Sequence, residues 1–107
     1  MLDASKQLRK SASPEKAKVL RRFFKTGPGE YADGDIFIGV KVPSIRKVSE
    51  QFQDLSFSDA IKLLRSRIHE ERFLALLILL RLFKEGDAKI KEKIYKTYLA
   101  NARFINN

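Results

Sequence analysis

The sequence has 107 residues, no cysteine, one histidine and a formal net charge of +9 at pH 7. This length predicts one domain or part of one, and a hydrophobic content of 44% is typical of a globular protein. Disulfides and thiolate metal sites are excluded, and a lone histidine cannot form an imidazole cluster, so we expect neither a metal nor any other cofactor. Residues 1–13 lack the apolar core of a signal peptide, which favours a cytoplasmic location.

Positive charge is concentrated near the N-terminus. Residues 1–25 carry eight Lys or Arg against two acids, whereas residues 26–42 carry one Lys against three acids. A basic cluster of this kind attracts polyanions, and we favour nucleic acid as the partner. The alternative is a well-solvated, lysine-rich surface without a specific partner.

Residues 2–11 are compatible with a short helix, although their apolar content is thin. A clearer helix begins at Ser13 and Pro14, because serine is a good N-cap and proline suits the first helical position. The glycines that begin at Gly27 end it. Its polar face carries Lys16, Lys18, Arg21, Arg22 and Lys25.

Residues 26–42 contain four of the five glycines and predict an ordered loop, with a short extended piece at residues 36–40. A phosphate cradle is disfavoured because no Gly-Lys-Ser/Thr sequence follows and the segment is acidic. Asp33 and Asp35 resemble the start of a calcium loop, but no Glu follows to close the coordination sphere.

Pro43 opens the next helix, whose outer face carries Arg46 and Lys47. Ser56 then caps the helix that precedes the central one. The central helix is predicted at residues 68–85, where eight consecutive residues from 73 to 80 are apolar. A helix that is apolar on every side has to be surrounded by other helices, whereas this run is too short to span a membrane.

A last helix, at residues 87–101, has its apolar residues along one face. The helices pair in a pattern that resembles HEAT-type repeats, with residues 14–25 against 43–53 and residues 57–66 against 68–85. The pattern predicts an all-α superhelix, or solenoid, of about six helices that is truncated at its C-terminal end. Because the face of residues 87–101 then lacks a partner, we expect self-association through it.

Few residues suggest chemistry. Glu70 and Glu71 suit the positive end of the central helix, and His69 is interpreted as a helix-start residue that bonds to backbone or solvent. The remaining surface features are basic helix ends and turns, which neutralise phosphates without reading sequence.

Three segments carry a family resemblance: LRRFFKTGPGEY at residues 20–31, FIGVKVP at residues 37–43 and IHEER at residues 68–72. Their combined spacing resembles the bacterial DNA alkylation repair family, the AlkD-like DNA glycosylases built of HEAT-like repeats. Residues 98–107 are similar to the segment just before that family's Trp-Asp-x-Val-Asp motif. On this resemblance, residues 1–107 are a single N-terminal portion of such a domain.

The resemblance implies a protein that binds duplex DNA with alkylated bases and, when intact, hydrolyses the N-glycosidic bond of alkylated purines. The catalytic Asp and its neighbouring Trp are expected beyond residue 107, so we expect no catalytic residue in this chain. Phe23 and Lys41 match positions near the DNA in the family. The residues we expect at the DNA are Arg21, Arg22, Phe23, Lys25, Lys41, Arg46 and Lys47. The alternative is a HEAT-repeat module without chemistry that binds DNA or another protein.

Overall fold

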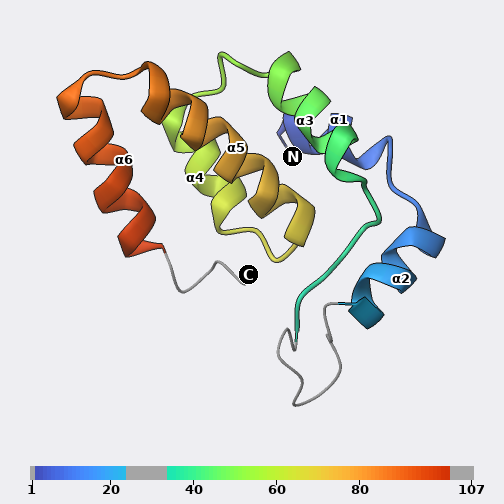
Figure 1. The fold of residues 1–107 in the computed structure, drawn as a ribbon. Coiled ribbons are helices and arrows are strands. Elements are labelled where there is room, and N and C mark those ends of the chain that lie inside the picture. Colours follow the sequence, from blue (N-terminus) through green and yellow to red (C-terminus); the bar gives the residue numbers. More distant parts are fainter. Residues whose placement is uncertain (1, 24–33, 102–107) are drawn as a thin grey trace.

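The computed structural model describes residues 2–23 and 34–101, and their regular structure is entirely helical (Figure 1). The helices are α1 (Asp3–Arg9), α2 (Pro14–Phe23), α3 (Val42–Gln51), α4 (Phe57–Leu64), α5 (His69–Glu85) and α6 (Ala88–Ala100). The predicted all-α helical repeat fold of about six helices is confirmed. Within the described ranges, no helix is long and apolar enough to cross a membrane.

Helix starts follow the capping residues in the sequence. Ser56 Oγ accepts the backbone N–H of Asp59 at 3.1 Å, and Asp87 Oδ1 accepts that of Ile90 at 2.9 Å. Each bond satisfies an amide that has no partner inside its own helix. These local bonds fix where α4 and α6 begin.

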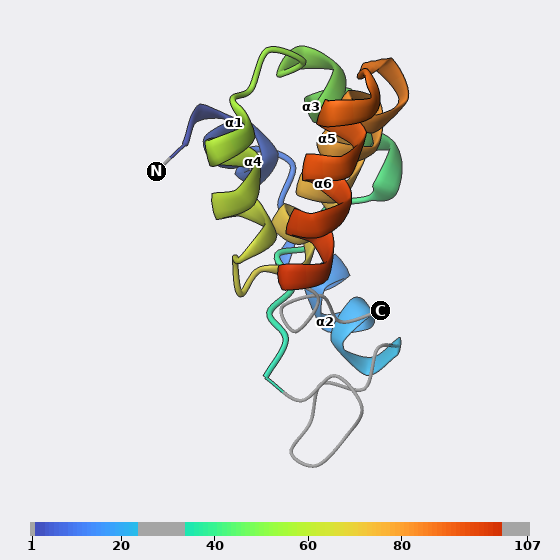
Figure 2. The same cartoon turned by 90° about the vertical axis from the view of Figure 1, so that its left-hand side faces the viewer.

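Helix α5 is the centre of the fold. Helices α3, α4 and α6 all pack on it, while α1 packs on α3. In Figure 2, α1 and α4 lie on one side of the molecule and α3 and α5 on the other. The side chains of Leu74, Ala75 and Ile78 are at most 2% exposed, which confirms the prediction that this helix forms the core.

The expected cover around α5 is incomplete, so the prediction of an all-round buried helix is wrong in part. Leu80 is 50% exposed and Phe83 is 37% exposed, although both lie in the most apolar stretch of the chain. The neighbouring helices cover only part of its circumference over the second half. An apolar surface is left between α3 and α6.

The first predicted helix pair is also wrong. Helix α3 packs on α1, not face to face on α2, which lies to one side of the helical body (Figure 1). Ala4 and Leu8 of α1 are fully buried, whereas α2 buries Ala17 alone. Small residues such as Ala4 allow the axes of two helices to approach closely, so the thin apolar content of α1 is sufficient.

Helix α6 keeps most of its apolar face uncovered, as the sequence predicts. Ile94 is 6% exposed, in contact with the core formed by α5. The other large apolar residues are 40% to 60% exposed, namely Ile90, Tyr95, Tyr98 and Leu99.

Candidate nucleic-acid interface

A buried carboxylate at the start of α5 organises the segment that leads into α3. Glu70 is 1% exposed, and its two oxygens accept the backbone N–H groups of three consecutive residues. The shortest distances to the nitrogens are 3.1 Å for Ile38, 2.8 Å for Gly39 and 3.1 Å for Val40. Bonds from amides to an ionised acceptor are stronger than neutral ones, and they satisfy both the carboxylate and the non-helical backbone.

A second buried cluster lies next to Glu70. Asp35 Oδ1 accepts a hydrogen bond from Arg72 Nη2 at 2.6 Å, and Asp35 Oδ2 lies 3.0 Å from His69 Nδ1. The guanidinium also donates to the Ser66 carbonyl at 2.9 Å. The Phe37 ring stacks on the His69 ring with centroids 4.5 Å apart. Charges buried this deeply require such pairing.

The carboxylate of Glu71, the next residue along α5, contacts α1 and not residues 38–40. Glu71 Oε1 accepts a hydrogen bond from Ser5 Oγ of α1 at 3.2 Å, and its Oε2 lies 3.6 Å from Arg9 Nη2. The second distance is too long for a hydrogen bond, so Oε2 is buried with an ion-pair neighbour alone. Adjacent acids of α5 therefore fix two different parts of the chain.

Sequence reasoning missed these roles. His69 is the first residue of α5, as predicted, but its ring contacts Asp35 and Phe37, which the expected bond to backbone or solvent did not include. Glu70 and Glu71 do occupy the first turn, but they are buried. One signal was available: four polar residues directly precede an apolar run, so they share the buried end of the central helix.

Gly39 joins this segment to the start of α2. Its backbone has φ +81°, and a Cβ there would lie about 2.0 Å from the Ser13 carbonyl oxygen and 2.7 Å from the Ala17 nitrogen. The Ser13 N–H donates to the carbonyls of Ile38 and Gly39 at 3.0 and 3.1 Å. Only glycine permits both this backbone conformation and this approach.

Beyond that junction, α2 and the helical body enclose apolar clefts. One cleft, of about 430 Å³, is lined by Val19, Leu20 and Phe23 of α2 and by residues of the body that include Phe37, His69 and Phe73. An adjoining cleft, of about 450 Å³, brings Lys16 of α2 beside Lys41. Helix α2 thus lies next to residues 40–42, where α3 begins.

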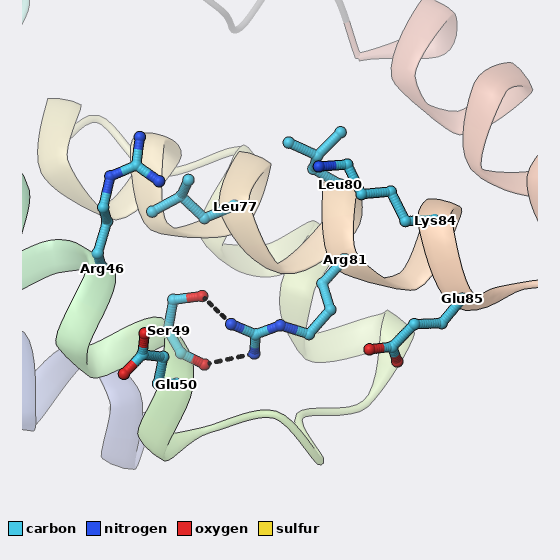
Figure 3. A pocket seen from close by; sticks show the side chains of 8 residues that line it. All are labelled: Arg46, Ser49, Glu50, Leu77, Leu80, Arg81, Lys84 and Glu85. Carbon is cyan, nitrogen blue, oxygen red and sulfur yellow. Dashed lines mark hydrogen bonds between the residues drawn. The ribbon is translucent and has the colours of Figure 1, made fainter.

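A third hollow lies between α3 and α5 (Figure 3). It measures about 250 Å³ and carries three cations, Arg46, Arg81 and Lys84, with Glu50 and Glu85 at its edge. Arg81 turns toward α3, where its Nη1 donates to the Ser49 carbonyl at 3.0 Å. Figure 3 shows Arg46 and Lys84 projecting to the same side as the exposed Leu80.

The structure places the predicted DNA-binding residues in two groups. Arg21, Arg22 and Phe23 form the exposed last turn of α2, and Lys41 precedes α3. Arg46 lies in the α3/α5 hollow, whereas Lys47 is exposed on α3 and lines none of the three hollows. Lys25 lies outside the described residues.

Three further cations belong with these groups, and sequence reasoning did not select them. Lys16 lines the cleft that contains Lys41, while Arg81 and Lys84 line the hollow that contains Arg46. Arg81 and Lys84 follow the central apolar run at residues 73–80. Their proximity to α3 depends on the packing of two helices, which periodicity does not show.

Comparison with protein families connects this geometry to DNA repair. The family model described as DNA alkylation repair enzyme matches residues 4–107. No curated protein and no solved structure matches the chain.

Proposed function

Since the chain belongs to the DNA alkylation repair enzyme family, we propose that it is the N-terminal portion of a repair protein and that it binds duplex DNA. The observation that carries this proposal is the hollow between α3 and α5, which three cations from the two helices line together with two acids. Cations on rigid helices neutralise phosphates at fixed positions without reading the bases. The net charge of +9 supports the same partner.

The intact protein, in this proposal, hydrolyses the N-glycosidic bond of alkylated purines. An alkylated purine already carries positive charge and leaves readily, so the enzyme has to stabilise the developing positive charge on the sugar. Two of the buried acids are unsuited to that task, because Asp35 is paired with Arg72 and Glu70 holds three amides. We therefore propose that the described residues bind DNA and that the catalytic Asp and Trp follow residue 107.

A second candidate is a HEAT-repeat module that binds DNA or a protein without chemistry. The groove between α5 and α6 has a volume of about 310 Å³ and an apolar lining that includes Leu80, Phe83, Tyr95 and Tyr98. Such a lining favours a protein partner. A second copy of the chain is the occupant we propose. The two surfaces adjoin, since Leu80 lines both the α3/α5 hollow and this groove, but Arg46, Arg81 and Lys84 line the hollow alone.

Charge reversal tests the DNA proposal. Binding of a fluorescent duplex is measured by anisotropy over a range of salt concentrations for the wild type and for Arg46→Glu/Lys84→Glu. The matched control is Lys6→Glu/Lys62→Glu, which changes the net charge equally on α1 and α4, on the other side of the molecule. The first variant should bind weakly with a salt slope that is shallower by about 0.9 for each phosphate it no longer neutralises. Equally weakened binding in both variants would show that only net charge matters.

A further inference from the structure

We propose that Glu70 is a positioning residue for the DNA-binding surface. It sets the path of residues 36–42, and through them it fixes where α2 and Lys41 lie relative to α3. This inference rests on the proposed DNA binding for its functional consequence, whereas the positioning itself can be measured without DNA.

Residues 35–40 lie between α2 and α3, outside any helix. Their amides at Ile38, Gly39 and Val40 all point to the Glu70 carboxylate. At its beginning, the segment pairs with residues near the start of α5, since the His69 N–H donates to the Ile36 carbonyl at 2.8 Å. One end of α5 therefore specifies the backbone path over most of the segment.

The segment is hydrogen-bonded to the residue that precedes α2. The first turn of α2 is attached to the body, since Ser13 bonds to Ile38 and Gly39 and Ala17 is buried. Farther along α2, Val19 is 64% exposed and borders the apolar clefts. The first turn is thus an attachment point of α2, and Glu70 supports it through its bonds to the amides of residues 38–40.

The path of residues 38–40 also determines where Lys41 lies relative to Lys16. Val40 lines both clefts beside α2, and the next residue, Lys41, shares one of them with Lys16. A different path for residues 38–40 would move Lys41 relative to Lys16. The spacing of phosphate contacts depends on such fixed positions, because each DNA phosphate lies at a defined place along the duplex.

The test compares two adjacent glutamates in the same turn of one helix. In Glu70→Gln, one acceptor oxygen becomes an NH₂ donor that meets a backbone N–H. In the control Glu71→Gln, the same change occurs toward Ser5 and Arg9 of α1. Hydrogen exchange should become about tenfold or more faster at residues 38–40 and at Ser13 and Ala17 in Glu70→Gln, with α4–α6 unchanged. Glu71→Gln should leave those amides protected.

Gly39→Ala tests the same junction from its other side and keeps Glu70. The added methyl would collide with the Ser13 carbonyl, so α2 should again become less protected at its first turn. If Glu70→Gln does not fold, hydrogen exchange in Gly39→Ala is measured in its place. Equal exchange in the Glu70 and Glu71 variants, or faster exchange spread evenly over all helices, would overturn the proposal.

DNA titrations then give the functional consequence. Glu70→Gln and Gly39→Ala should bind duplex more weakly than the wild type. The slope of log affinity against log salt concentration should become shallower by about 0.9 for each phosphate that Lys16 and Lys41 no longer neutralise. The phosphate contacts of Arg46 and Lys84 should remain. An unchanged slope, despite faster exchange at residues 38–40, would overturn the role in binding. If the wild type binds no DNA, the proposed function fails, and the exchange data still decide whether Glu70 positions the segment.

Discussion

Asp35 Oδ1 lies 2.6 Å from Arg72 Nη2, and the two side chains are 1% and 6% exposed, so a complete ion pair is enclosed at the start of the central helix. Removing one member of such a pair leaves an uncompensated buried charge. Asp35→Ala should therefore lower the free energy of unfolding by about 3–5 kcal/mol, measured by urea unfolding. Glu92→Ala, which removes an exposed i,i+4 partner of Lys96, should cost at most about 1 kcal/mol. Similar costs for both variants would contradict the burial of Asp35.

Core packing of α5 gives a second prediction. Leu74 is fully buried, and Leu80 of the same helix is 50% exposed. Leu74→Ala should destabilise by about 2–5 kcal/mol because it leaves a cavity, and thermal or urea unfolding measures this. Leu80→Ala removes the same atoms and should cost about 1 kcal/mol or less. Reversed costs would mean that α5 is turned about its axis.

Self-association gives a third prediction. Tyr95 is 60% exposed and Leu99 is 54% exposed, which is a large apolar area for a surface helix. Sedimentation equilibrium should show a mean mass that rises with concentration. Tyr95→Glu/Leu99→Glu should stay monomeric and keep the wild-type circular dichroism, since neither side chain is in the core. A wild type that is monomeric at every concentration would refute this surface as an interface.

Base excision gives a fourth prediction. The 107-residue chain should release N7-alkylated purine from duplex DNA no faster than spontaneous hydrolysis, because the buried acids Asp35 and Glu70 are committed to internal bonds and the catalytic Asp and Trp are proposed to follow residue 107. Loss of a group that stabilises a transition state typically costs about 10²–10³ in rate. Chromatography of the released base, beside a no-protein control, measures the rate. Release at an enzymatic rate would place the catalytic group within these residues.

Sequence periodicity predicted the helices well because each apolar stripe and cap acts within a few residues. The central position of α5 followed from its composition alone. The pairing of α3 with α1 could not be predicted in this way. Ala4 and Leu8 are two isolated small or apolar residues in the sequence, and they form a core contact only because another helix lies against them.

The candidate site was predicted less completely than the fold. Arg46 was selected for its exposed position on a helix, whereas Lys84 joins it only through the packing of α3 on α5. The link between Glu70 and residues 38–40 spans about 30 positions in the chain. No local pattern reports a contact over that separation, and a carboxylate at a helix start has an ordinary local explanation.

The bond between Ser5 and Glu71 joins residues that are 66 positions apart. During synthesis, α1 leaves the ribosome long before the helix that holds its partner exists. At about 5–20 residues per second, that delay is roughly 3–13 s. Throughout this interval Leu8, which is fully buried in the finished fold, lacks the central helix that completes its core. Helix α1 is therefore made well before the central helix that holds it in place.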